Sequence, residues 1–476
     1  MSHPLPGAGS DAGAATRPGT AAGGRGVKAA ASRIAPDPLF RRILRNTGVL
    51  LGGKVATGLL NLAAFSVAMH SLGSARMGVL VLAHSLAQTV ATFVKFQSWQ
   101  AVLRFGTGSL DPSRRAEMQA LLRFTTMLDL ASAGAGALVA CAAAWFLGPS
   151  LGWPSETLPL ATAYATVSAF LVVATPVGLL RLFDRFDLLA QRDAAGAAFR
   201  LAGTLVAAAL GAGLPGFLAA WYGAAVLGAV ALVAGAWHET ARRGLLRPVP
   251  HGRRVRATQA HPGLWGFVWT TNLMTTLSLG SGQLATLCVG WILGPAETAL
   301  FALARRLGEA ALKPSRFLTP VFYPEFAQLA VLRDRNTLRH LLRRSLLLST
   351  ILALALLAFL AVAGEWLLRL TGGLEAQAAY PVMLLLAVAA AIGLAGFALE
   401  PLHVSVGRHA LALRLRLAAT VTYVPLALVG LTWLGLEGAG LAAIASALLL
   451  LVGQAVPAMR WLAGAEVHAD VRPSTR

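Results

Sequence analysis

Charged side chains are scarce in this chain of 476 residues: they make up 13% of it, against 56% hydrophobic residues and a mean hydropathy of +0.66. A soluble domain cannot bury that much apolar surface. Cysteine is rarer still. Cys141 and Cys288 both lie in apolar runs, which excludes a disulfide framework and a zinc motif. The composition therefore excludes an ordinary soluble enzyme and indicates a membrane protein.

Acidic residues are half as frequent as basic ones. The chain has 20 Asp and Glu against 40 Lys and Arg, which gives a formal net charge of +20. Such an excess often serves a nucleic acid or an acidic surface. In membrane proteins, however, cytoplasmic loops collect Lys and Arg as topology signals. We therefore predict a lipid bilayer as the surroundings and no nucleic-acid partner.

The apolar runs are long enough to cross a membrane, which takes about 20 residues each. Turn-forming or charged clusters divide them into twelve predicted spans: 43–70, 78–103, 118–147, 157–180, 195–212, 215–238, 263–292, 298–328, 342–370, 377–405, 411–433 and 438–462. Basic residues are distributed unevenly between the two sides of this layout. Of the 40, only Arg76 and Arg369 fall on one side, six fall inside helices, and 32 fall on the other side or at the helix ends beside it. Both termini are therefore predicted to be cytoplasmic.

Two segments recur at nearly the same spacing. LGSARMGVLVLAHSL from Leu72 resembles LGPAETALFALARRL from Leu293, 221 residues later, and LPGFLAA from Leu214 resembles LEGAGLA from Leu436, 222 residues later. Both halves have six spans, so they enter the membrane from the same side. The predicted fold class is an all-α membrane protein of about twelve transmembrane helices, in two six-helix lobes related by a pseudo-twofold axis along the membrane normal.

The predicted domain limits follow from the repeat and from local composition. They are a disordered cytoplasmic tail at 1–38, an N-terminal lobe at 39–238, a basic cytoplasmic linker at 239–262, a C-terminal lobe at 263–464 and a cytoplasmic tail at 465–476.

Ionisable residues inside the predicted spans are the strongest functional signal, because each needs a partner, a wet cavity or a route to the interface. Three of the only four lysines lie there. His84, Gln88, Thr92 and Lys95 share one helical face, and adding 221 gives Arg305, Glu309, Lys313 and Arg316. Another face carries Lys54, Thr57 and Asn61. We predict a basic cavity with six substrate-binding residues: Lys54, Asn61, Lys95, Arg305, Lys313 and Arg316.

Two acidic residues accompany this basic set. Glu309 lies one turn from Arg305 and from Lys313, so it either balances their charge or couples transport to protons. Asp129, in the middle of the third span, either pairs with Lys54 or titrates during transport. For the cations themselves, the alternative to substrate binding is that their long side chains reach the membrane interface.

Catalytic signatures are missing from the sequence. There is no GxxxxGK[ST] motif, no metal-ligand spacing, no Ser/His/Asp set and no long non-cytoplasmic loop. We therefore expect no cofactor, no metal and no enzymatic activity. Transport of an anionic substrate fits the residues better.

The whole pattern resembles the polysaccharide and oligosaccharide-lipid flippases, a group that includes the O-antigen flippases of lipopolysaccharide biosynthesis. They belong to the multidrug/oligosaccharidyl-lipid/polysaccharide exporter superfamily. The similar segments are RNTGVLLGGKVATGLLNLAAF, LGSARMG, GLLRLFDRF, VGWILGPAETALFALARRL and LTPVFYPEFAQL. Related flippases often have an acidic residue five positions before the glycine of a segment like VGWILG, where this chain has Ala285.

The resemblance implies alternating access in the inner membrane. The implied substrate is an anionic, polyprenyl-diphosphate-linked glycan that moves from the cytoplasmic to the outer leaflet, and polysaccharide assembly proteins are possible partners. Three alternatives share part of the pattern. A drug antiporter should have acidic cavity groups, a peptidoglycan-precursor flippase often has two extra helices, and a membrane glycan polymerase or glycosyltransferase needs a large outer loop.

Overall fold

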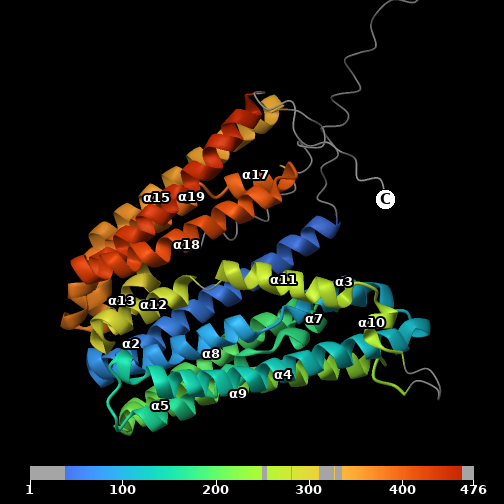
Figure 1. Cartoon of the computed structure of the whole chain (residues 1–476), viewed down its shortest axis with the longest axis horizontal. Coiled ribbons are helices and arrows are strands. Elements are labelled where there is room, and N and C mark those ends of the chain that lie inside the picture. The colour runs from blue at the N-terminus through green and yellow to red at the C-terminus, as the bar shows by residue number, and fades with distance from the viewer. Residues whose placement is uncertain (1–37, 249–254, 280, 310–325, 327–334, 464–476) are drawn as a thin grey trace, which may run out of the picture. The chain divides into compact units, whose positions relative to one another are not determined.

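The computed structural model describes residues 38–248, 255–279, 281–309, 326 and 335–463. Val49–Arg476 forms one compact unit, and Met1–Gly48 forms another, to which only the first turns of α2 belong. All contacts given below lie within the larger unit. Over the described residues the secondary structure is helical and contains no strand (Figure 1).

The first half of the chain contains long helices with interruptions. Its α-helices are α2 (Pro38–Val94), α3 (Ser98–Gly106), α4 (Arg115–Leu147), α5 (Leu158–Ala165), α6 (Ser168–Leu171), α7 (Ala174–Leu182), α8 (Phe186–Ala209) and α9 (Gly213–Arg242). Short 3-10 turns flank α4: η1 (Thr107–Ser109), η2 (Pro112–Arg114) and η3 (Pro149–Leu151). The helix α2 comprises two helices joined at Gly73, whose backbone is not helical.

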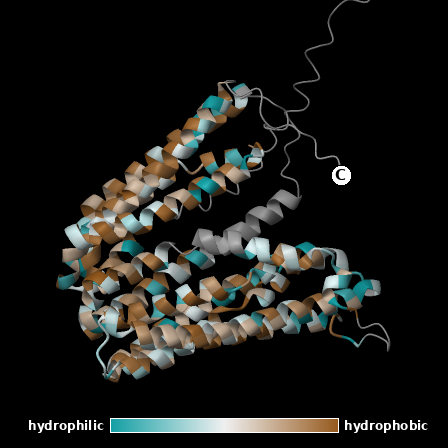
Figure 2. Cartoon of the chain, in the orientation of Figure 1, coloured by the Kyte–Doolittle hydropathy of each residue, from teal (hydrophilic) through white to brown (hydrophobic). Residues whose placement is uncertain are grey.

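The second half follows the same plan. It contains α10 (Ala257–Ala260), α11 (Leu264–Leu279), α12 (Ser281–Leu293), α13 (Pro295–Gly308), α15 (Arg335–Gly372), η5 (Leu374–Ala379), α16 (Tyr380–Ala395), α17 (Leu399–Ser405), α18 (His409–Leu434) and α19 (Leu436–Leu462). Eight helical stretches among the described residues are long and apolar enough to cross a membrane. Hydrophobic residues follow the length of these helices in Figure 2. Many large side chains among them are exposed, such as Val362 at 86% and Trp433 at 84%, as lipid contact requires.

The backbone repeats the spacing found in the sequence. Residues with positive φ occur in pairs, one in each half: Gly73 and Gly294, Gly152 and Gly373, Asp184 and Gly407, Gly213 and Gly435. The members of the four pairs are 221, 221, 223 and 222 residues apart. Gly73 and Gly294 also share their ψ region, at 171° and −177°. The two halves therefore turn at corresponding places.

Several spans predicted as continuous helices are broken. The chain leaves helical structure at 95–97, between α2 and α3, and again at Val172 and Val173, between α6 and α7. Pro176 explains the second break, because it has no N–H to donate to the carbonyl four residues earlier. Pro401 has the same relation to the break between α16 and α17. Such breaks leave backbone groups available inside a membrane protein.

The two halves share one apolar cluster. It joins Phe65, Met69 and Leu82 of α2 to Val289 of α12 and Phe301 of α13. Small residues permit the close approach: a Cβ added at Gly78 would collide with the backbone of Pro295, and one at Gly290 with the side chain of Leu82. These contacts lie near the turns predicted to be non-cytoplasmic.

Candidate functional site

The predicted substrate-binding residues fall into three groups in the structure. Asn61 and Arg305 lie in polar clusters, and Lys95 lies half-buried beside a break in two helices. Lys54 is exposed on α2 and has no hydrogen-bond partner among the described residues. Lys313 and Arg316 lie outside the described residues. Their assignment to the cavity stays a prediction.

A basic cluster occupies the interior of the first half. Arg200 of α8 donates from a guanidinium nitrogen to Asn61 Oδ1 at 3.1 Å, and its guanidinium carbon lies 5.0 Å from the centre of the Trp221 ring. Asn61 itself is oriented by donating to the Thr57 carbonyl at 2.8 Å. The Nε of Arg200 is buried and has no hydrogen-bond partner in the described structure. Arg200 therefore keeps donor capacity for a further acceptor.

His84 lies next to this arginine. It is 7% exposed, its Nδ1 is 2.8 Å from the Tyr164 hydroxyl, and its ring meets Trp221 edge to face at 5.2 Å. The sequence analysis placed His84 on the polar face of α2, and the structure shows that aromatic side chains from α5 and α9 hold it there.

Arg306 of α13 brings a positive charge from the second half to the same place. Its guanidinium carbon lies 4.0 Å from the centre of the fully buried Phe65 ring of α2. The charges of Arg200 and Arg306 both act on His84, and those of Arg200 and Arg305 both act on Arg306. Among the described residues neither Arg200 nor Arg306 forms an ion pair with a carboxylate. The cluster of Arg200, Arg306 and His84 is therefore a site of uncompensated positive charge, called the arginine cluster below.

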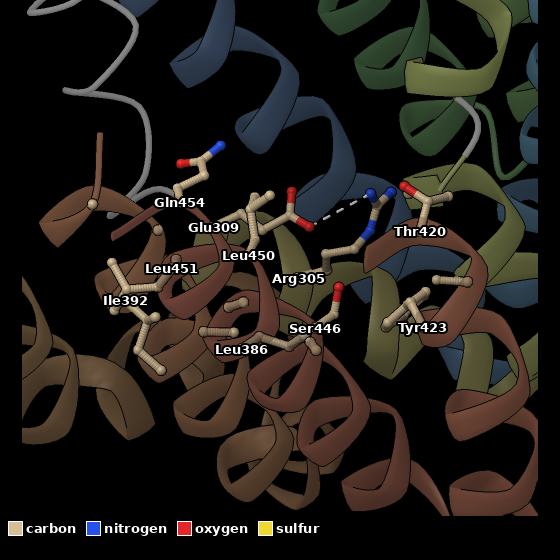
Figure 3. A pocket seen from close by; sticks show the side chains of 18 of the residues that line it. Arg305, Glu309, Leu386, Ile392, Thr420, Tyr423, Ser446, Leu450, Leu451 and Gln454 are labelled. Carbon is tan, nitrogen blue, oxygen red and sulfur yellow. Dashed lines mark ion pairs between the residues drawn. The ribbon is translucent and has the colours of Figure 1, made fainter. Parts of the chain in front are cut away.

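A cavity of about 290 Å³ lies in the second half, next to Arg305 (Figure 3). Leu386, Ile392 and Leu451 form an apolar part of its wall, and polar side chains from four helices complete it: Arg305, Glu309, Thr420, Tyr423, Ser446 and Gln454. Figure 3 shows Arg305 between Glu309 and Thr420. The buried Nε of Arg305 and the Nε2 of Gln454 have no hydrogen-bond partner in the part of the chain described.

Charge in this cavity is partly balanced. A guanidinium nitrogen of Arg305 lies 3.8 Å from Glu309 Oε1, so the predicted charge-balancing contact is present, although it is long for an ion pair. Gly282 provides the space for the guanidinium, because a Cβ there would lie 2.7 Å from it. Ala285, where related flippases often have an acid, also lines the cavity. Arg305 consequently has one carboxylate near it in the cavity.

The acid of the third span lies beside a lysine other than the one considered from sequence. Asp129 of α4 is 6% exposed and interacts electrostatically with Lys95. The pairing with Lys54 that the sequence left open is replaced here by Lys95. No group of three or more His, Cys, Asp or Glu that could hold a metal ion occurs in the described ranges.

Sequence reasoning did not identify the arginine cluster. Arg200 was counted among the basic residues inside helices without a role, and Arg306 lies off the face that carries Arg305 and Glu309. The available signal was the presence of Arg200 within the apolar run of the fifth span. Its partners Asn61 and Trp221 come from distant parts of the sequence, so the spacing within one helix does not reveal them.

Solved structures with this fold are membrane transporters. The chain matches the inward-facing conformation of a multidrug resistance MATE family transporter of the MOP superfamily, with TM-score 0.70 and 16% identity over 89% of this chain and 100% of the other. It matches the lipid II flippase MurJ in an inward closed conformation with TM-score 0.65 and 10% identity, over 86% and 87% of the two chains. These similarities confirm the predicted fold class of an all-α membrane protein in two lobes. The fold defines a transporter and not an enzyme.

Sequence comparison gives the family. The polysaccharide biosynthesis protein family matches residues 113–375, which is more than half of the chain. The inner membrane protein YghQ of Escherichia coli (strain K12) is 34% identical over 353 residues, which cover 73% of this chain and 97% of YghQ. The chain belongs to the polysaccharide biosynthesis protein family, and it is a multi-pass inner-membrane protein of the flippase and exporter type.

Proposed function

We propose that this protein turns a polyprenyl-diphosphate-linked oligosaccharide, or a related polysaccharide precursor, from the cytoplasmic to the outer leaflet of the inner membrane. The observation that carries the proposal is the arginine cluster. Two guanidinium groups and an imidazole lie in the interior without a described carboxylate partner, and a diphosphate is an anion that can compensate them.

The cavity beside Arg305 supports a sugar as the remaining part of the substrate. Hydroxyl groups of Thr420, Tyr423 and Ser446 and the amide of Gln454 line it together with apolar surface. Ligand sites combine apolar walls with a few placed polar groups, and hydroxyls and amides both donate to and accept from sugar hydroxyls. The acyl tail needs no protein cavity, since it stays in the bilayer.

The basic residues predicted from sequence have a place in this mechanism. The diphosphate enters from the cytoplasm, meets Lys95, Lys313, Arg316 and Lys54, and reaches the arginine cluster. Closure of the lobes at the cytoplasmic side and separation at the apolar contact around Phe65 then release it to the other leaflet. Both termini and the 239–262 linker lie on the cytoplasmic side in this scheme, and polysaccharide assembly proteins use the product.

Flipping by the purified protein tests the proposal directly. Proteoliposomes receive a polyprenyl-diphosphate-linked disaccharide with a fluorophore on the sugar, and a membrane-impermeant reductant bleaches only the outer leaflet. The wild type is expected to expose the inner-leaflet pool, whereas Arg200→Gln loses at least about tenfold in rate, the effect of about 1.4 kcal/mol. Arg369→Gln, which removes an exposed arginine on α15, is the matched control.

Three results would contradict the proposal. They are an unchanged rate in Arg200→Gln, no flipping by the wild type of any lipid diphosphate, and equal transport of cationic drugs. The last outcome would identify a drug antiporter, whose fold the chain shares. Flipping of lipid II in preference to other diphosphates would instead identify a peptidoglycan-precursor flippase.

A further inference from the structure

Asp129 lies where two broken helices meet. Lys95 follows the last residue of α2, Ser98 begins α3, and Thr175 lies in the first turn of α7. The helices α3, α4 and α7 pack against one another, and Asp129 lies on α4 between the two breaks. The main-chain irregularity and the buried carboxylate therefore coincide in space, although the residues are up to 80 positions apart.

The oxygen atoms at this place are poorly satisfied. The Thr175 main-chain N–H donates to Asp129 Oδ2 at 2.6 Å. The other carboxylate oxygen, Oδ1, is buried and has no hydrogen bond, and the same holds for the hydroxyls of Ser98 and Thr175. Ser98 is 0% exposed and Thr175 is 1% exposed, yet both hydroxyls are near enough to act on the carboxylate. Buried polar atoms are seldom left in this way, and three together require an explanation.

The charge that faces the carboxylate is held loosely. Lys95 acts on Asp129 electrostatically, but its Nζ donates to the Leu171 carbonyl at 3.4 Å, at the edge of hydrogen-bond distance. Arg181 and Arg192 repel the ammonium from the cytoplasmic parts of α7 and α8. No other charged group acts on Asp129 in the described structure. Lys95 is thus the counter-ion of Asp129 without being fixed to it.

Lys95 also belongs to the substrate path. Its main-chain N–H donates to the Ala91 carbonyl at 2.9 Å, so it continues the register of α2 and stays on the face of His84 and Gln88. An anion that moves along this face toward the arginine cluster passes Lys95. The ammonium therefore has two competing anionic partners, the Asp129 carboxylate and the substrate.

We propose that Lys95 and Asp129 form an exchange pair that couples transport to a monovalent cation, a proton or a sodium ion. When the substrate diphosphate takes Lys95 away, the Asp129 carboxylate binds the cation with Ser98 and Thr175 oxygens beside it. When the substrate leaves, Lys95 returns and the cation is released. This inference rests on the proposed function, since it assumes an anionic substrate in the path.

The first test is linkage between anion and cation binding in the purified full-length protein. Farnesyl diphosphate is the probe, and its affinity is measured by calorimetry across pH and with sodium or choline as the buffer cation. For a coupled proton, affinity is expected to rise as pH falls, by up to about tenfold per pH unit, the limit for one linked proton. For coupled sodium, affinity rises with sodium at constant pH. Either dependence supports the exchange pair, because linkage is reciprocal.

Two variants assign that dependence. Asp129→Asn leaves Lys95 free, so the probe is expected to bind with an affinity that no longer varies with pH or sodium. Glu156→Gln removes an exposed carboxylate from the same half and should keep the wild-type dependence. A dependence that survives in Asp129→Asn, or one that is absent from the wild type, would overturn the inference while leaving the proposed function intact.

The second test needs no substrate. Lys95→Met removes the ammonium, so the buried carboxylate must take up a cation by itself. We expect either the infrared C=O band of a protonated carboxyl group or bound radioactive sodium, and we expect both signals to vanish in Lys95→Met with Asp129→Asn. If Lys95→Met gives neither signal, the exchange pair is refuted, whether or not the probe binds to the wild type.

Discussion

The arginine cluster and the cavity beside Arg305 present positive charge in two different ways. In the first half, Arg200 is held by Asn61 and Trp221, and no described carboxylate opposes it. In the second half, Arg305 lies beside Glu309 in a cavity of about 290 Å³. The first arrangement keeps its charge in one place and needs an external anion. The second has an internal anion that a substrate must displace. Repeated backbones have thus acquired different sites.

The largest effect is expected from removing charge in the arginine cluster. Arg200→Gln should weaken binding of farnesyl diphosphate by roughly 10–100-fold, since a hydrogen bond to a charged group contributes about 1.5–3 kcal/mol. Calorimetry on the purified protein measures this, and Arg369→Gln should bind as the wild type does. Equal affinities of the two variants would place the diphosphate elsewhere.

A change of opposite sign is expected in the cavity. Glu309→Gln removes the carboxylate that competes for Arg305, so binding of the same probe should become a few-fold tighter. An ion pair of partly exposed side chains contributes about 0.2–1 kcal/mol, and Glu309 is 48% exposed. Weaker binding in Glu309→Gln would show that the carboxylate holds Arg305 in position and does not compete with the substrate.

Space for Arg305 can be tested without changing a charge. Gly282→Ala places a Cβ 2.7 Å from the guanidinium, so the side chain has to move and the probe should bind about two- to fivefold more weakly. Gly223→Ala is the matched control, because it makes the same substitution in helix α9 with no atom within 4 Å of the new Cβ. If both variants bind alike, the position of Arg305 is unimportant for the anion.

The smallest effect concerns the contact between the halves. Phe65→Leu keeps an apolar side chain but removes the ring under Arg306, which should cost about 0.5–2 kcal/mol of stability. Thermal unfolding in detergent measures the loss. Phe146→Leu, at a side chain that is 77% exposed, should change the unfolding temperature less. An equal loss in both would mean that the cation–π contact contributes nothing beyond burial.

Much of the architecture could be predicted because a membrane restricts it so strongly. Apolar runs of about 20 residues must be helices, and the spacing of 221 residues between Leu72 and Leu293 indicated the repeat that Gly73 and Gly294 show in the backbone. The breaks at 95–97 and 172–173 were missed, because hydropathy measures how well a segment suits lipid and not whether its main chain is regular.

The sequence by itself determined the setting of the site: a membrane, two related halves and several basic residues inside the helices. Only the tertiary structure decided which charges meet. Lys95 lies beside Asp129, Arg200 bonds Asn61, and Arg306 stacks on Phe65, all through contacts between helices distant in the chain. Helical periodicity fixes the face on which a side chain lies, but the partner that faces it depends on how the helices pack, and electrostatic interactions in the interior depend on that distance.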